Sequence, residues 1–343
     1  MEMLETIGIF FAQTFIIVLA IIAILLTLAS LALKNRHKDS FEIELLHERF
    51  EDQTQALKES FLTDQEIKKE HKRLKKEAKQ KQKEDSDKKQ RRIFVVHFLT
   101  GDIKASDSEN LKEEINTILG VATKDDEVVV KVESPGGLVH SYGYAAAQLI
   151  RVRDAGIPLT VCVDQVAASG GYLMACVGSK VIAAPFALIG SIGVVAQVPN
   201  FNRLLKKHDV DYKEYTAGDY KRTVSIFGEI TEKGEAKFKE QLELTHQLFK
   251  SFVSRFRPQL DLNKVATGEF WYGETAISLG LIDEIKTSDE YLLTLSKDHH
   301  VVKISFEHKP TLMEKISEGI SGAISKGISL AIRKLADQNT LVK

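Results

Sequence analysis

The middle of the chain alternates between short apolar runs and amphipathic stretches. The runs Ile93–Leu99, Val128–Glu133 and Leu159–Val163 predict strands, and the stretches Ser108–Leu119 and Tyr142–Ala155 between them predict helices. Strands that alternate with helices form a largely parallel sheet, whose active groups gather at the strand ends. An α/β fold built from repeated strand-helix units is therefore expected.

Residues 1–33 predict a transmembrane anchor. No residue from Ile7 to Leu33 is charged, and a helix of this length, rising about 1.5 Å per residue, spans a bilayer core of roughly 30 Å. A cleaved signal peptide fits less well, because its apolar region is shorter and follows a basic segment. Lys34 and Arg36 follow the run, which favours a cytoplasmic location for the rest of the chain, although long domains can cross regardless.

Residues 34–92 predict a charged helical connector. Leu46, Phe50, Leu57 and Phe61 recur at helical spacing and predict an apolar stripe that could pair with another chain. Residues 66–92 hold thirteen Lys or Arg against six Asp or Glu. This run reads most simply as a solvated linker, and attraction to anionic lipid is the alternative. Nucleic acid is not expected as a partner, because the run has no aromatic residue on which a base could stack.

Two glycine turns follow predicted strands: Ser134-Pro135-Gly136-Gly137 and Ala168-Ser169-Gly170-Gly171. A serine hydroxyl needs a neighbouring base to act as a nucleophile, and glycines allow the backbone to turn sharply beside Ser169. The N–H of Gly170, with that of Gly136 or Gly137, could bind a substrate carbonyl oxygen. The two turns together predict a serine nucleophile beside an oxyanion hole.

Composition does not identify the base that would activate Ser169. No histidine lies between His140 and His208, and His208 lies in what looks like an exposed helix end. His97 and His140 stay candidates, because triad partners need not be close in sequence. Lysine can also act as a base when burial favours its neutral form, but the chain holds many lysines.

No metal ion or cofactor is expected, and Cys162 and Cys176 predict buried thiols because apolar residues flank them.

Four motifs, in their order and spacing, resemble those of the signal peptide peptidase A family. They are Ser134–Gly137, Ala168–Tyr172, Gly190–Val194 and Tyr220-Lys221-Arg222, and the resemblance is strongest from Ile93 to Ile285. It implies a ClpP/crotonase-like fold and a serine endopeptidase with Ser169 as nucleophile and Lys221 as general base. It further implies that Ser191 orients Lys221, and that Gly137 and Gly170 are the oxyanion donors, with Gly136 as the alternative to Gly137. Without the motif, Ser191 would read as a residue that caps a turn.

The resemblance also implies a mechanism, partners and a location. Neutral Lys221 would take the Ser169 proton, and the resulting acyl-enzyme would be hydrolysed by water. Peptides or membrane-protein fragments are the expected substrates, and a homo-oligomeric ring is expected to shape the substrate cleft. The bacterial inner membrane is the expected location; the family favours a periplasmic domain, in conflict with the basic residues after the anchor.

Two other functions fit the same fold. A catalytically silent membrane scaffold would use the connector and the tail for assembly. Acyl-CoA chemistry on a crotonase-like fold is less favoured, because it does not require Ser169 together with Lys221.

Residues 93–300 are expected to form the peptidase domain, with a long helix at Glu232–Arg257, and residues 301–343 a C-terminal amphipathic tail. Apolar residues repeat every four positions from Leu312 to Ile332, which suits a partner subunit, a membrane surface or packing on the same chain. The uncharged run Val181–Val198 could be mistaken for a second membrane span. Its proline and glycines favour a buried strand and turn instead.

Overall fold

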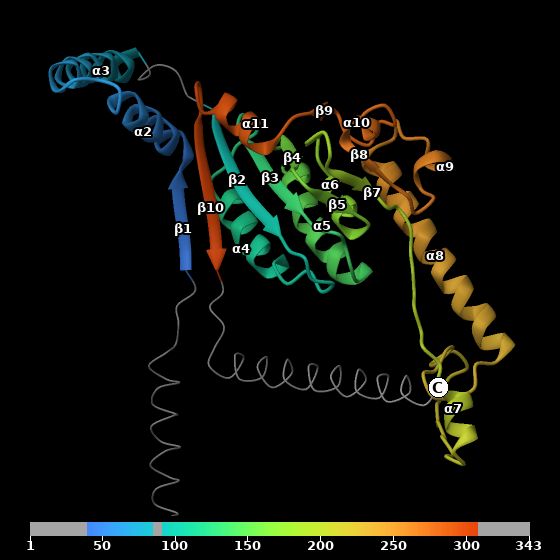
Figure 1. Ribbon diagram of the computed structural model, residues 1–343. Coiled ribbons are helices and arrows are strands. Elements are labelled where there is room, and N and C mark those ends of the chain that lie inside the picture. The colour runs from blue at the N-terminus through green and yellow to red at the C-terminus, as the bar shows by residue number, and fades with distance from the viewer. Residues whose placement is uncertain (1–39, 85–90, 308–343) are drawn as a thin grey trace, which may run out of the picture. The chain divides into compact units, whose positions relative to one another are not determined.

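The computed structural model describes residues 40–84 and 91–307 (Figure 1). The predicted anchor at residues 1–33 and the tail from residue 308 onward lie outside these ranges, so both remain predictions. Among the described helices none is both long enough and apolar enough to cross a membrane. Residues 42–306 form one compact unit.

The main sheet has seven strands in the order β1-β10-β2-β3-β4-β6-β9. Their bounds are β1 Ser40–Leu45, β2 Arg92–Leu99, β3 Glu127–Glu133, β4 Leu159–Val163, β6 Lys180–Ala183, β9 Glu284–Ile285 and β10 His300–Glu307. Each neighbouring pair from β10 to β9 is parallel, which confirms the predicted parallel sheet. Helices α4 (Ser108–Leu119) and α5 (Val139–Asp154) follow β2 and β3, as the alternation predicts.

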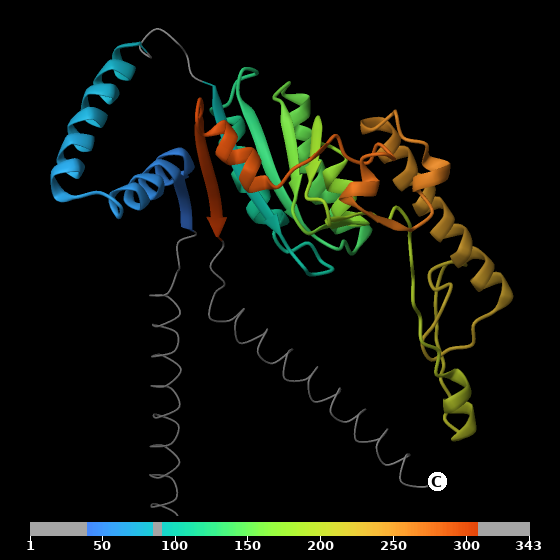
Figure 2. The same cartoon turned by 45° about the horizontal axis from the view of Figure 1, so that its top comes forward.

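Both faces of the main sheet are covered. Val128 and Val130 of β3 belong to a large apolar cluster that includes residues of α4, α5 and α6 (Gly170–Ala175), whereas Val129 belongs to a smaller cluster. The smaller cluster lies on the opposite face, beneath α11 (Ser288–Leu295), seen in front of the sheet in Figure 2. Successive strand residues point to opposite faces, so a strand buried on both sides is apolar throughout, as Val128–Val130 is.

A second, three-stranded sheet carries the turns of interest. Its strands are β5 (Val166–Ala168), β7 (Leu188–Gly190) and β8 (Phe270–Tyr272), in the order β5-β7-β8. β5 and β7 are parallel, and β7 and β8 are antiparallel. Strand β7 and all of β6 except its first residue, Lys180, lie within the apolar run 181–198, which confirms that this run is strand and turn rather than a membrane helix.

The predicted helical connector needs a correction at its start. Ser40–Leu45 is strand β1, at the edge of the main sheet, because its apolar and acidic side chains alternate with the period of a strand. The helices α2 (Leu46–Glu59) and α3 (Asp64–Glu84) follow it, as predicted. The apolar stripe is divided: Leu46 and Phe50 pack on the smaller cluster, while Leu57 and Phe61 are exposed.

The predicted boundary between domain and tail at residues 300 and 301 is wrong. It cuts through β10, which runs from His300 to Glu307 and pairs with β2. The main sheet therefore continues past residue 300, and Val301 and Ile304 of β10 are buried on its two faces.

A long excursion separates β7 from helix α8 (Glu232–Phe256), which forms where Glu232–Arg257 was predicted. Within residues 194–231 the only helix is α7 (Asn202–Lys207). Many apolar side chains of this segment are exposed: Val195, Phe201, Leu204, Val210, Tyr212, Tyr215, Tyr220, Ile226 and Phe227. After α8 come the short helices α9 (Leu262–Val265) and α10 (Gly273–Ala276).

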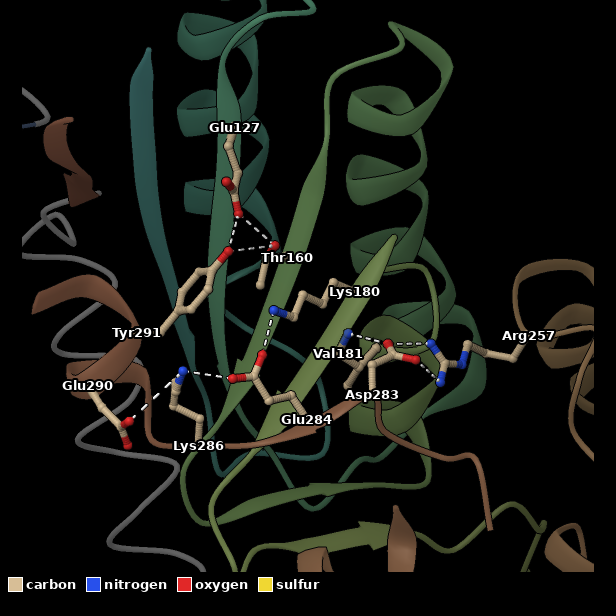
Figure 3. Close-up of polar contacts among 10 residues, drawn as sticks. All are labelled: Glu127, Thr160, Lys180, Val181, Arg257, Asp283, Glu284, Lys286, Glu290 and Tyr291. Carbon is tan, nitrogen blue, oxygen red and sulfur yellow. Dashed lines mark hydrogen bonds and ion pairs between the residues drawn. The ribbon is translucent and has the colours of Figure 1, made fainter. Parts of the chain in front are cut away.

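The end of α8 is tied to the main sheet by an ion pair between the buried Arg257 and the partly exposed Asp283. The Arg257 guanidinium donates to both carboxylate oxygens of Asp283, at 2.7 and 2.9 Å, and to the carbonyl oxygen of Gly280. Asp283 also accepts the backbone N–H of Val181 in β6, as Figure 3 shows. These bonds fix α8, which contributes Thr245 and Phe249 to the wall of the cavity described next.

Candidate active site

Ser169 lies on a sharp turn between strand β5 and helix α6. Its backbone has φ +52° and ψ −117°, a conformation that residues with a side chain rarely adopt. Such a conformation costs about 1–3 kcal/mol and persists only where the surroundings impose it. Here the Ser169 N–H donates to Gly190 O at 2.8 Å, and the Ser169 carbonyl accepts the N–H of Leu173 at 2.9 Å. The strand-turn-helix geometry is that of a nucleophile elbow.

A cavity of about 450 Å³ opens beside this turn. Four of the five predicted site residues line it: Ser169, Ser191, Gly137 and Gly170. Much of the remaining wall is apolar and comes from Val139, Tyr142, Leu173, Val194, Val195 and Phe249. The structure therefore brings the predicted nucleophile, its predicted orienting serine and both predicted oxyanion glycines to one cavity.

Lys221, the fifth predicted residue, does not line this cavity. It lies in the excursion 194–231, its side chain is exposed, and its backbone N–H donates to Gly218 O. Among the described residues that line the cavity there is no Lys, His, Asp or Glu. One copy of the chain thus presents a serine without the base that the resemblance implies.

The histidines do not fill this gap. His140 and His208 are exposed, and neither lines the cavity. His97 lies on β2, where burial, with the charges of Lys303 and Lys131, lowers its pKa to about 4. It does not line the cavity either, so the described residues offer no Ser-His arrangement at Ser169.

The two glycine turns meet beside Ser169. A Cβ atom placed on Gly136, whose φ is +90°, would lie 2.5 Å from Gly170 N and 2.8 Å from the Cβ of Ser169. The Gly136 N–H donates to Ser134 Oγ at 3.2 Å. The N–H groups of Gly137 and Gly170 have no acceptor among the described residues, and both glycines line the cavity. This favours Gly137 over Gly136 as the partner of Gly170 in an oxyanion hole.

Ser191 follows β7 as Ser169 follows β5. Its φ is also +52°, and its N–H donates to Glu269 O at 2.6 Å. Because it lines the cavity, its hydroxyl can meet a group that enters beside Ser169. The backbone of Ser191 also holds a turn, so the structural role that the sequence offers as the alternative is compatible with its place on the cavity wall.

Two residues beneath the site could not be recognised from the sequence, which places Ser134 in a turn and Tyr142 at the start of a helix. Both are fully buried, and their hydroxyls lie 2.6 Å apart. A buried tyrosine needs a partner for its hydroxyl, and that requirement is the only signal in the sequence that could have drawn attention to it.

Cys162 and Cys176 are buried free thiols, as predicted, and burial raises the pKa of both. In the described ranges no group of three or more His, Cys, Asp or Glu is arranged to hold a metal ion.

Comparison with known proteins shows the family of this chain. The model of peptidase family S49 matches residues 151–302, and that of the family's N-terminal region matches residues 2–149. The chain belongs to peptidase family S49.

Within the family, its similarity is to the SohB proteases. It is 49% identical to "Probable protease SohB" of Haemophilus influenzae over 325 residues, which cover 92% of each chain. It is 43% identical to the protein of the same name from Buchnera aphidicola over 311 residues, or 88% of each chain. "Protease 4" of Salmonella typhi is 26% identical over 219 residues, 61% of this chain and 34% of that protein. The resemblance inferred from the four motifs is confirmed.

Proposed function

We propose that this chain is a membrane-anchored serine endopeptidase with a ClpP/crotonase-like fold, which cleaves peptides or membrane-protein fragments through an acyl-enzyme at Ser169. The observation that carries the proposal is the position of Ser169. It occupies a strained turn on a cavity whose wall also holds the unbonded N–H groups of Gly137 and Gly170.

The chemistry follows from this geometry. A base takes the proton of Ser169 Oγ as the oxygen attacks the substrate carbonyl carbon, and the two glycine N–H groups bind the negative oxygen that develops. The same base returns the proton to the leaving amine. Water then hydrolyses the ester on Ser169 by the reverse sequence of proton transfers.

The base in this proposal is Lys221 of a neighbouring copy. Lys221 is exposed, and the excursion that carries it presents a row of exposed apolar side chains, which suits contact with another subunit. The cavity wall includes Val194 and Val195, where this excursion begins. Burial of the amine between two copies would favour the neutral form that a general base requires, and Ser191 would hydrogen-bond and orient it.

Mixing inactive variants tests the arrangement between subunits. Ser169→Ala and Lys221→Ala should each abolish peptidase activity, and their co-assembly should restore part of it, because some interfaces then pair an intact serine with an intact lysine. Lys213→Ala, an exposed lysine on the same excursion, serves as the control and should stay active. A co-assembled mixture that stays inactive would show that the lysine does not act across the interface.

Active-site labelling tests the enzyme class itself. A fluorophosphonate probe should form a covalent adduct at Ser169 of the wild-type chain and none in Ser169→Ala. Absence of labelling in the wild type would favour the catalytically silent scaffold.

The anchor and the location are part of the same proposal. The full chain should fractionate with the bacterial inner membrane and resist carbonate extraction, and a variant that lacks residues 1–33 should not. A reporter of known sidedness fused to Lys343 would decide between the periplasm and the cytoplasm.

A further inference from the structure

Tyr142 lies beneath both halves of the proposed oxyanion hole. It is the fourth residue of α5, it is fully buried, and its ring meets Phe98 edge-on with centroids 6.2 Å apart. Its hydroxyl donates to the carbonyl oxygen of Asp102 at 2.9 Å. The same hydroxyl lies 2.6 Å from Ser134 Oγ.

Proton counting gives these bonds a direction. A phenol has one proton, and that of Tyr142 is committed to Asp102 O. Ser134 must therefore donate its own proton to Tyr142 and keep its lone pairs for the N–H of Gly136, which lies 3.2 Å from Ser134 Oγ. The result is one chain of hydrogen bonds from Gly136 through Ser134 and Tyr142 to Asp102.

This chain of hydrogen bonds determines which N–H of the Gly136–Gly137 turn is left without an acceptor. The Gly136 N–H is bonded to Ser134, whereas the Gly137 N–H has no acceptor among the described residues, and Gly137 lines the cavity. The loop that contains Asp102 also holds the end of the Gly136–Gly137 turn, because the N–H of Leu138 donates a hydrogen bond to Ile103 O at 2.8 Å.

The ring of Tyr142 supports the second donor. A Cβ atom on Gly170 would lie 2.4 Å from Cγ of Tyr142, so the backbone of Gly170 rests directly on the ring. A single side chain thus contacts the Gly170 backbone and, through Ser134, the Gly136–Gly137 turn.

We infer that Tyr142 is a positioning residue for the oxyanion hole: its hydroxyl fixes the Gly136–Gly137 turn through Ser134, and its ring fixes Gly170. This inference rests on the proposed function of Ser169. Tyr142 acts through the two glycines and is assigned no proton transfer.

Tyr142→Phe tests the hydroxyl while it keeps the ring. Loss of one oxyanion donor costs an enzyme about 100- to 1,000-fold in kcat, so a donor that is loosened but present should cost about 10- to 100-fold. KM for a peptide ester should stay within about twofold, because the donors act most strongly on the transition state. Ser134→Ala breaks the same chain and should have a similar effect, and the double variant should be no worse than the more damaged single variant.

A sulfur substitution in the substrate separates positioning from general damage. A thiono ester places sulfur, a weak hydrogen-bond acceptor, where the oxyanion forms. The ratio of the hydrolysis rates of an oxo ester and its thiono counterpart should therefore fall in Tyr142→Phe, and a merely structural loss would leave this ratio unchanged.

Tyr172→Phe is the matched control. Tyr172 is also fully buried, and its hydroxyl donates to Leu281 O at 2.9 Å, away from the cavity wall. It should lower the midpoint of urea unfolding about as much as Tyr142→Phe and leave both kcat and the rate ratio unchanged.

Two outcomes overturn the inference. In the first, Tyr142→Phe has the same kcat and the same ratio of oxo to thiono ester hydrolysis as the wild type. In the second, Tyr172→Phe loses as much kcat as Tyr142→Phe does. The fluorophosphonate probe separates these from failure of the proposed function. If wild-type Ser169 is labelled and Tyr142→Phe behaves like wild type, only the inference fails. If wild-type Ser169 is not labelled, the proposed function fails and the inference fails with it.

Discussion

Ser169 and Ser191 occupy equivalent positions at the ends of two paired parallel strands. Ala168 of β5 is in register with Gly190 of β7, and the serine that follows each has a φ of +52°. The N–H of Ser169 donates to the carbonyl of Gly190, which joins the two turns directly. The strain at the proposed nucleophile is therefore imposed by the small sheet, and it is imposed on its proposed orienting group as well.

This strain predicts that two replacements of Ser169 differ in stability. Ser169→Gly relieves the positive φ and should be more stable than Ser169→Ala by about 1 kcal/mol, because glycine adopts this conformation without steric cost. Both variants should be inactive. The unfolding midpoints of the two purified variants give the comparison.

Ser141 of α5 serves as the control for this experiment. At a helical position alanine is favoured over glycine by roughly 1 kcal/mol, so Ser141→Ala should be more stable than Ser141→Gly. If alanine were also the more stable residue at position 169, the turn would not be strained.

Gly143 and Gly170 should respond in opposite ways to replacement by alanine. Gly143→Ala should stabilise the chain by about 0.5–1 kcal/mol, because Gly143 lies within α5 and a Cβ there meets nothing within 4 Å. Gly170→Ala should lose activity and stability together, because its Cβ would lie 2.4 Å from the ring of Tyr142. Urea unfolding and ester hydrolysis measure both effects, and a fully active Gly170→Ala would contradict the close packing.

Glu114 should make stability depend on pH. It is buried on α4; one carboxylate oxygen accepts the N–H of Phe306 at 2.9 Å, and the other has no partner. Burial, with a smaller contribution from Asp107 and against the attraction of Lys303, raises its pKa from 4.5 to about 8. Between these values the folded chain holds a proton that the unfolded chain releases, so the free energy of unfolding should fall as pH rises from about 4.5 to 8.

Glu114→Gln removes this ionisation and keeps an acceptor for Phe306. Its unfolding free energy should therefore decline less between pH 5 and pH 8 than that of the wild type, by up to a few kcal/mol. Glu109→Gln, an exposed residue of the same helix, should leave the wild-type slope nearly unchanged. Parallel slopes for wild type and Glu114→Gln in urea titrations would show that Glu114 is not the group responsible.

The ion pair at the end of α8 should stabilise the fold. Arg257→Ala removes a buried guanidinium that donates to Asp283 and to Gly280 O, while Asp283, with 34% of its side chain exposed, can be hydrated, so the change should cost about 2–3 kcal/mol. Arg257→Lys should rescue only part of this, because an ammonium cannot reproduce the paired contacts to Asp283 together with the bond to Gly280. Lys264→Ala breaks an exposed pair with Asp261 and should cost less than about 1 kcal/mol. Equal unfolding midpoints for Arg257→Ala and Lys264→Ala would contradict the prediction.

The parallel α/β core and the two glycine turns could be predicted from local patterns in the chain. Apolar periods of two and of about 3.6 residues are local properties, so β2, β3, β4, α4 and α8 could be read from single stretches of chain. The same local patterns did not predict β1 or the extent of β10. β1 is the edge strand and β10 is its neighbour, and both depend on pairing with strands that are distant in the chain, as β10 pairs with β2.

How the glycine turns are used depends on contacts between segments that are distant in the chain. The choice of Gly137 over Gly136 depends on a bond from Gly136 to Ser134, and the support of both donors depends on Tyr142 and Asp102, which lie 40 positions apart in the chain. The motif that contains Lys221 also does not predict that this residue is exposed and lies outside the cavity that Ser169 lines. A motif fixes which residues are present and in what order. Which hydrogen bond is made, and which surface is left for another copy, depends on how distant segments pack.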